Sequence, residues 1–220
     1  MKAIGIFGGA FAPFHNGHLR VAIDARDKLD LYQVRLIPTA HAAHRPDSRI
    51  SAQRRLEWLR LAVRREKNLI PDDREILRAG VSYTVETLAE LRHDFPRAAL
   101  VLIMGSDAFE HLHTWSRWQQ LIELAHIAAI TRPGNAPYPS AETAGLLSSR
   151  RAADAAALHR QPAGLWLPLE IPQLDISSTR IRRLLKQERS VRALVPDAIL
   201  NAMTAADVAA LTQDNDATQH

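Results

Sequence analysis

The sequence contains no cysteine, only four lysines and no long apolar stretch, and each absence excludes a class of protein or site. Without cysteine there are no disulfide bonds, thiolate nucleophiles or cysteine-based zinc and iron sites, which suits a reducing compartment. No apolar run is long enough to span a bilayer, and Met1 and Lys2 lead directly into the first expected strand. We therefore expect no signal peptide, no membrane partner and a cytoplasmic location.

The charged residues limit the kind of ligand. Lysine and arginine together number 28, against 24 acidic residues, which gives a formal net charge of +4. Because lysine is scarce, the positive charge is mostly arginine, whose guanidinium group suits two-point binding of phosphate. The arginines are scattered among acidic residues and form no single basic run. We therefore expect a small polyanionic ligand and no nucleic acid.

Apolar periodicity predicts an α/β fold, a Rossmann-like doubly wound parallel sheet in one domain. Of the 220 residues 46% are apolar, enough for a sizeable core, and we place the domain at 1–212 with C-terminal helices from about 177 and a disordered tail over 213–220. The expected strands are 3–7, 34–38, a short one near 75–77, 98–104 at the centre of the sheet, 126–131 and 165–169. The expected helices are 19–29, one capped by Ser51, 85–95, 115–124 and one near the end of 135–160.

The segment 3–20, AIGIFGGAFAPFHNGHLR, joins the first expected strand to the first helix through a turn suited to phosphate. Gly8 and Gly9 have no side chains to block the approach of a ligand. The proline just before the histidines cannot lie inside a helix, so His15 and His18 fall at or beside the first helical turn. Free N–H groups and the helix dipole favour an anion there. The spacing matches neither common phosphate loop, and histidine takes the place of lysine.

A second polar motif, ISSTRIR at 176–182, opens the helix expected from about residue 177. It offers three hydroxyl groups at a helix start and guanidinium groups from Arg180 and Arg182, which together form a strong polyphosphate site. In a parallel sheet the carboxyl ends of the strands lie at the same edge, where ligands bind. The two motifs are therefore expected to meet at that edge and to form a polyphosphate site.

The two motifs resemble the signatures of the nucleotidyltransferases that move a nucleoside monophosphate from ATP onto a phosphate. The pattern G-G-x-F-x-P-x-H-x-G-H, from Gly8 to His18, is similar to the first signature, and I-S-S-T-x-I-R to the second. Over nearly the whole chain the details resemble bacterial nicotinate-nucleotide adenylyltransferases. The further segments that carry this resemblance are SYT at 82–84, GSD at 105–107, TW at 114–115, RPG at 132–134 and LVP at 194–196.

The resemblance implies a site for ATP at the sheet edge. His15 would orient the α-phosphate, His18 would stabilise the transition state, and Arg182 would complete the catalytic set. Asp107 has two interpretations, a contact with ribose or the second substrate, or a simple helix cap. The residues implied in ATP binding are Gly8, Gly9, Phe11, His15, His18, Gly105, Asp107, Ile176, Ser177, Ser178, Thr179 and Arg182.

The resemblance also implies a site for the second substrate, nicotinate mononucleotide. Trp115 would stack on the pyridine ring, and backbone N–H groups near Thr84 and Ser116 would receive its carboxylate. The residues implied in this site are His44, Arg45, Ser82, Tyr83, Thr84, Trp115, Ser116 and Arg132. The implied reaction is in-line attack by the mononucleotide phosphate on the α-phosphorus of ATP, which gives deamido-NAD and pyrophosphate for NAD biosynthesis. Mg²⁺ would arrive with ATP, and no protein nucleophile is needed.

Other interpretations stay open. The family usually has Thr or Ser in place of Ala10 and Asp in place of Ala12, so an ATP-binding regulatory protein with weak catalysis is one alternative. Another is an adenylyltransferase of the same superfamily that uses nicotinamide mononucleotide or phosphopantetheine. His41 and His44 repeat the spacing of the first histidine pair, but that pair belongs to the phosphate loop, so no protein-bound metal is expected. Side chains alone do not separate acid from amide acceptors, or a monomer from a homo-oligomer.

Overall fold

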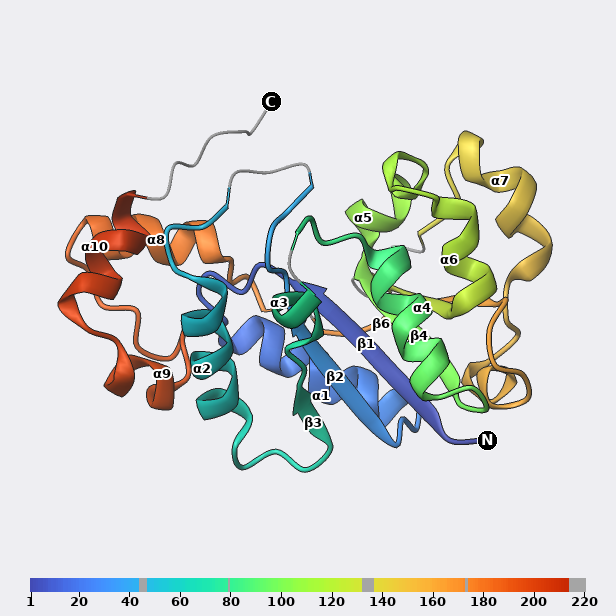
Figure 1. The fold of residues 1–220 in the computed structure, drawn as a ribbon, viewed down its shortest axis with the longest axis horizontal. Coiled ribbons are helices and arrows are strands. Elements are labelled where there is room, and N and C mark those ends of the chain that lie inside the picture. The colour runs from blue at the N-terminus through green and yellow to red at the C-terminus, as the bar shows by residue number, and fades with distance from the viewer. Residues whose placement is uncertain (44–46, 79, 132–136, 173, 214–220) are drawn as a thin grey trace.

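The computed structural model describes residues 1–43, 47–78, 80–131, 137–172 and 174–213. They form a six-stranded sheet flanked by helices (Figure 1). The strands are β1 (Ala3–Gly9), β2 (Gln33–Pro38), β3 (Leu69–Pro71), β4 (Ala99–Gly105), β5 (His126–Thr131) and β6 (Trp166–Glu170). Neighbouring strands are parallel in the order β3-β2-β1-β4-β5-β6, so the direction of winding reverses between β1 and β4. This confirms the predicted doubly wound parallel sheet.

Helices cover both faces of the sheet (Figure 1). The α-helices are α1 (Asn16–Lys28), α2 (Ala52–Val63), α3 (Arg74–Arg78), α4 (Thr84–Asp94), α5 (Ser106–Glu110), α6 (Trp118–Leu124), α7 (Ala141–Leu147), α8 (Ser178–Lys186), α9 (Asp197–Ala202) and α10 (Ala205–Gln213). Short 3₁₀ turns are η1 (Leu112–Thr114), η2 (Ser148–Arg150) and η3 (Ala155–His159). No helix in the described ranges is long and apolar enough to cross a membrane, and the cytoplasmic location stays a prediction.

Strand β4 separates the two halves of the core. Its odd-numbered residues, from Ala99 to Ile103, pack with α1, α2 and the C-terminal helices. Its even-numbered residues, from Leu100 to Met104, pack with α4, α5 and α6. Because both faces of β4 are covered, neither side of the strand needs polar residues, which explains its continuous apolar run. The predicted position of this strand at the centre of the sheet is confirmed.

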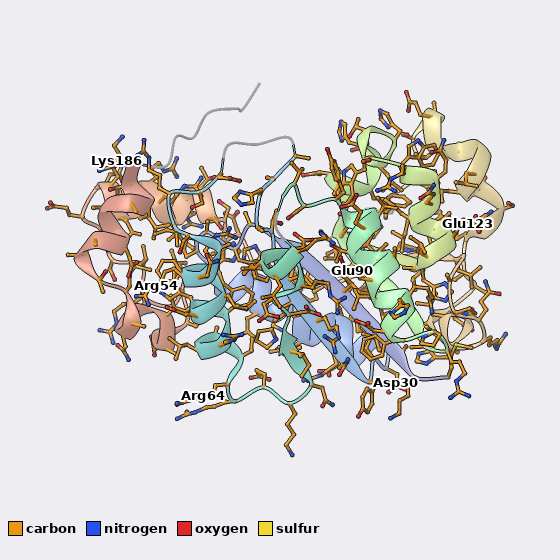
Figure 2. The ribbon with its side chains drawn as sticks, viewed as in Figure 1. Asp30, Arg54, Arg64, Glu90, Glu123 and Lys186 are labelled. Carbon is orange, nitrogen blue, oxygen red and sulfur yellow. The ribbon has the colours of Figure 1, made fainter. Side chains whose placement is uncertain are left out.

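The C-terminal helices are attached to α2, on the left in Figure 1. Arg54 of α2, labelled in Figure 2, donates to both carboxylate oxygens of Asp207 on α10, over 3.2 and 2.8 Å, and to the Ala202 carbonyl at the end of α9, over 2.7 Å. These contacts hold α9 and α10 beside the helix that follows β2. The tail predicted over 213–220 lies outside the described residues, apart from Gln213, which ends α10.

Two predicted elements are placed differently. The prediction of a short strand near 75–77 is wrong, because these residues belong to α3. The edge strand β3 comes earlier, at Leu69–Pro71. Asp72 lies between the strand and the helix, and its carboxylate accepts the N–H of Arg74, the first residue of α3, over 3.1 Å. The helix expected from 115 begins at Trp118, because Arg117 has a left-handed backbone with φ of 50°.

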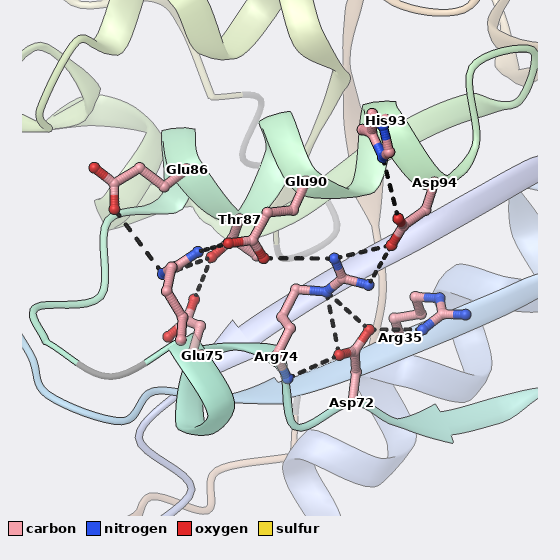
Figure 3. A network of polar contacts seen from close by, with 10 residues as sticks. Arg35, Asp72, Arg74, Glu75, Glu86, Thr87, Glu90, His93 and Asp94 are labelled. Carbon is pink, nitrogen blue, oxygen red and sulfur yellow. Dashed lines mark hydrogen bonds and ion pairs between the residues drawn. The ribbon is translucent and has the colours of Figure 1, made fainter.

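A network of ion pairs attaches α3 to α4 (Figure 3). Arg78 on α3 donates to Glu90 on α4 over 2.8 Å, and Arg74 reaches Asp94 at the end of α4 over 3.3 Å. The network fixes the position of α4, whose first residue, Thr84, belongs to the predicted site for the second substrate. The network therefore connects the start of the predicted second-substrate site to α3, the helix that follows the edge strand β3.

Candidate active site

The first helix begins with reciprocal hydrogen bonds between the two motif histidines. His15 is the N-cap of α1, and its Nδ1 accepts the His18 N–H over 3.3 Å. The His18 Nδ1 accepts the His15 N–H, also over 3.3 Å, and the two rings are stacked with centroids 3.6 Å apart. Because each Nδ1 accepts a hydrogen bond, each neutral ring carries its proton on Nε2. Both rings therefore keep an Nε2–H donor for a ligand.

The surroundings of the histidines favour the neutral form. Burial lowers the pKa of His15 to about 4. Burial, and secondarily the charge of His15, lower the pKa of His18 well below its ordinary value. Phe14 stacks on His18 with centroids 5.4 Å apart, and Phe11 meets the same ring edge-on at 5.0 Å. A bound polyphosphate would raise both pKa values, because a nearby negative charge stabilises the imidazolium form.

The start of α1 lies against two late segments of the chain. The Asn16 N–H donates to the Leu194 carbonyl over 2.9 Å. At Gly17 an added Cβ would lie 3.0 Å from the His15 Nδ1 and 3.5 Å from the Ile176 carbonyl oxygen. Gly17 therefore permits a close approach between the histidine motif and the start of the second motif.

The second motif binds directly to the backbone of the first. The Ser178 Oγ donates to the Pro13 carbonyl over 3.1 Å, and the Arg182 Nη1 donates to the Ala12 carbonyl over 3.0 Å. The Arg182 Nη2 also donates to the Thr179 hydroxyl over 3.1 Å, which fixes the half-buried guanidinium group. The two motifs therefore meet at the predicted edge. Ser178 and Arg182 hold the loop in addition to any role toward phosphate.

Ser177 and the ends of β1 and β4 complete this side of the site. Ser177 caps α8, because its hydroxyl accepts the Arg180 N–H over 3.1 Å. An added Cβ at Gly8 would lie 3.9 Å from the Ile37 carbonyl oxygen, and an added Cβ at Gly105 would meet no described atom beyond its chain neighbours within 4 Å. Apart from chain neighbours, the described residues thus leave open space beside both strand ends.

Asp107 lies in the first turn of α5 but does not cap it. The N-cap residue of α5 is Gly105, which makes no side-chain cap hydrogen bond. Within the described part of the chain the Asp107 carboxylate has no hydrogen bond. The interpretation of Asp107 as a helix cap is therefore wrong, and its contact with ribose or the second substrate stays a prediction.

The predicted acceptor site begins at the start of α4, where Ser82 has a structural task. Its hydroxyl accepts the N–H groups of Ala40 and His41, over 3.2 and 3.4 Å, and its own N–H donates to the His41 carbonyl over 2.8 Å. Ser82 thus ties the loop after β2 to the start of α4. Tyr83 is the N-cap residue of α4 and makes no side-chain cap hydrogen bond.

Two backbone N–H groups of the predicted acceptor site make no hydrogen bond among the described residues. Among the described residues neither the Thr84 N–H nor the Ser116 N–H has a hydrogen-bond partner. Trp115 is half-buried against the core, and the next turn is joined to α4 by an ion pair of 2.9 Å between Arg117 and Glu86. The structure therefore joins the Trp115 segment to the first turns of α4, as the prediction requires.

Some predicted residues cannot be placed in this site. His44, Arg45 and Arg132 lie outside the described residues. His41 pairs with Asp47, whose carboxylate is 2.6 Å from the His41 Nδ1. Within the described ranges no three His, Cys, Asp or Glu side chains gather as a metal site.

One buried side chain that contacts the phosphate loop was not predicted from the sequence. It is that of Arg55 on α2, which is 4% exposed. A signal for it is present in the sequence. Arg55 lies one helical turn before Leu59, on the stripe of α2 that faces the core, where an arginine needs a specific set of acceptors.

Comparison with known proteins shows the family of the chain. The family described as cytidylyltransferase-like matches residues 6–184. A protein of Marinobacter nauticus, named as a probable nicotinate-nucleotide adenylyltransferase, is 41% identical over 201 residues, which cover 91% of this chain and 93% of that protein. A protein of the same name from Dechloromonas aromatica is 42% identical over 204 residues, which cover 91% and 94%.

A solved structure has a similar fold. Plasmodium falciparum nicotinic acid mononucleotide adenylyltransferase, solved with NaAD, matches with a TM-score of 0.65 and 16% identity over 98% of this chain and 97% of that one. At this identity the likeness concerns the fold, whereas the two sequence relatives show the family. The chain therefore belongs to the cytidylyltransferase-like family and, within it, to the nicotinate-nucleotide adenylyltransferases.

Proposed function

We propose that this protein transfers the adenylyl group of ATP to the phosphate of nicotinate mononucleotide, forming deamido-NAD and pyrophosphate in NAD biosynthesis. The observation that carries this proposal is the contact between the two motifs, in which Ser178 and Arg182 hold the loop before the histidine pair. This contact gathers imidazole, hydroxyl and guanidinium donors at one end of the sheet. The family to which the chain belongs supports the choice of substrates.

The proposed mechanism relies on positioning and on charge. The triphosphate of ATP lies between the start of α1 and the start of α8, with the β- and γ-phosphates on Ser177, Ser178, Thr179 and Arg182. The Nε2–H groups of His15 and His18 donate to the α-phosphate. Attack by the acceptor phosphate increases the charge on the oxygens of the transferring group, and donors already in place stabilise that charge. No covalent protein intermediate is required.

We propose that Mg²⁺ reaches the site with ATP. When bound, it would neutralise part of the triphosphate charge. The hydrogen-bond donors on this side of the site suit phosphate groups, so they fit a metal ion that the nucleotide itself holds. The phosphate side of the site offers imidazole and guanidinium N–H groups, and the described residues form no cluster of metal-ligating side chains, so phosphate oxygens and water would be the ligands.

The acceptor site favours an acid over an amide. The N–H groups of Thr84 and Ser116 are both donors, and a carboxylate can accept from both of them. With one donor on each carboxylate oxygen, a nicotinamide would instead turn its NH₂ group toward one of these N–H groups. That NH₂ and that N–H would both lack a partner, which costs binding free energy. Trp115 would supply the ring surface beside them. We therefore propose nicotinate mononucleotide as the acceptor.

Pyrophosphate release from ATP and Mg²⁺ tests this function, with nicotinate mononucleotide, nicotinamide mononucleotide and phosphopantetheine offered separately. We expect kcat/KM for the nicotinate acceptor to exceed that for the amide by about 100-fold or more, because a site built from donors rejects an analogue that cannot accept. Release with another acceptor would keep the mechanism and change the substrate. No release with any acceptor, from protein that binds ATP, would instead support a regulatory protein.

Ala12 provides a test of whether the departure from the usual family pattern affects the rate. Its side chain is buried, at 4% exposure, and its carbonyl already accepts from Arg182. Because the backbone holds Arg182, we expect Ala12→Asp to change kcat by less than about threefold, a barrier difference below about 0.7 kcal/mol. Steady-state kinetics would measure it. A gain of tenfold or more would show that the missing carboxylate slows the native protein.

A further inference from the structure

Arg55 of α2 belongs to neither motif, yet it contacts the phosphate loop. Its Nη1 donates to the Ala10 carbonyl over 2.6 Å, its Nη2 to the Thr39 carbonyl over 2.7 Å, and its Nε to the Ile50 carbonyl over 3.2 Å. These acceptors come from the loop after β1, the loop after β2 and the segment before α2. One buried guanidinium group therefore connects three segments of chain at the sheet edge.

The contact with Ala10 determines where the next N–H group points. In a trans peptide the C=O and the N–H point in opposite directions, so the hydrogen bond from Arg55 to the Ala10 oxygen directs the Phe11 N–H away from α2. Among the described residues the Phe11 N–H has no hydrogen-bond partner. Phe11 also has a left-handed backbone with φ of 49°, which a residue with a large side chain rarely adopts without support.

We propose that Arg55 is a positioning residue for the proposed adenylyl transfer: it holds the phosphate loop so that the Phe11 N–H faces the triphosphate of ATP. This inference rests on the proposed function. The Thr39 N–H supports the same geometry, because it donates to the Gly9 carbonyl over 3.0 Å and so turns the preceding peptide the same way. Arg55 needs no contact with ATP for this role.

A matched control exists at the other end of the sheet. Arg92 of α4 also donates to several carbonyls, among them those of Ala98 over 2.7 Å and Leu124 over 2.8 Å. These residues precede β4 and β5, so they lie at the amino ends of the strands, opposite the candidate site. Replacing either arginine by lysine removes the multiple hydrogen bonds and keeps the charge. Of the two arginines, Arg55 donates to the phosphate loop, whereas Arg92 donates to carbonyls at the opposite end of the sheet.

The test compares Arg55→Lys with Arg92→Lys by thermal unfolding, by titration with Mg²⁺ and ATP in the absence of acceptor, and by steady-state kinetics. We expect both variants to unfold at lower temperature. Arg55→Lys should weaken ATP binding about tenfold and lower kcat by a further factor of about ten, because small displacements of a positioning group are costly. Arg92→Lys should leave both constants within about twofold. Equal effects of the two changes on ATP binding would reduce Arg55 to a purely structural role.

A second measurement does not depend on the stability of the variant. The chain has five phenylalanines, so ¹⁵N-phenylalanine labelling gives a simple amide spectrum of the native protein. We expect the Phe11 amide signal to shift strongly when Mg²⁺ and ATP are added. If the protein binds ATP and this signal does not move, the inference about Arg55 is overturned and the proposed function still stands. Protein that binds no ATP would overturn the proposed function as well.

Discussion

Replacing His18 with asparagine is expected to lower kcat by about 100-fold or more while the protein stays folded, because one transition-state donor is lost. An asparagine side chain can still accept the His15 N–H, as the His18 Nδ1 does over 3.3 Å, but it has no atom at the position of Nε2. The substitution therefore keeps the helix cap and removes the donor. Pyrophosphate release measures the loss, and circular dichroism checks the fold.

His18→Gln is the matched control for this prediction. Its amide NH₂ can reach the position of Nε2, but it has no atom at the position of Nδ1, so accepting the His15 N–H would need a different side-chain conformation that takes the amide away from the Nε2 position. If the Nε2–H donor carries the effect, the glutamine variant should keep more activity than the asparagine variant. The opposite order would mean that His18 acts chiefly as a partner of His15 in the start of α1. Equal and near-native activity of both would remove His18 from the mechanism.

Replacing Arg182 with methionine is expected to lower kcat/KM for ATP by about 100-fold to 1,000-fold. Two losses combine in this variant. A positive charge disappears beside the proposed position of the β- and γ-phosphates, and the Ala12 carbonyl loses the donor that holds the loop over 3.0 Å. Arg183 provides the control, because it is the next residue of α8 and is exposed. Arg183→Met should stay within about threefold of the native value in the same assay.

Arg182→Lys separates the two losses. Lysine keeps the charge but cannot bind the Ala12 carbonyl and the Thr179 hydroxyl with one planar group. We expect an activity between those of the native protein and the methionine variant, with most of the remaining loss in kcat. If lysine restored full activity, the tether to Ala12 would have no catalytic importance. A similar loss in Arg183→Met would show that the net charge of the helix matters and the position does not.

Much of the fold follows from local patterns. The apolar run of β4, the cap at Ser51 and the position of Pro13 before α1 each depend on nearby residues, and each was predicted. The edge strand β3 has three residues and ends at a proline, so its pattern is too short to identify. The sequence near 75–77 looked like a strand because a five-residue helix hardly shows a helical period.

The parts of the site that could not be predicted depend on tertiary contacts. The histidine pair was found because both residues lie in one helical turn. The Ser82 hydroxyl is occupied by N–H groups of Ala40 and His41, which lie more than 40 residues earlier. His126, which had no assigned role, is fully buried, and its Nδ1 accepts the Leu165 N–H over 3.1 Å. Hydrogen bonds between residues so far apart in the sequence leave no periodic pattern that a single sequence could show.

The hydrogen bonds from Ser178 to Pro13 and from Arg182 to Ala12 join residues that are 165 and 170 positions apart. During synthesis on the ribosome, the histidine half of the site emerges first and has no partner until most of the remaining chain has followed. Closing so long a loop costs conformational entropy, which the core shared by α8 and the sheet must offset. The two halves of the proposed nucleotide site therefore cannot meet in a newborn chain until α8 has left the ribosome.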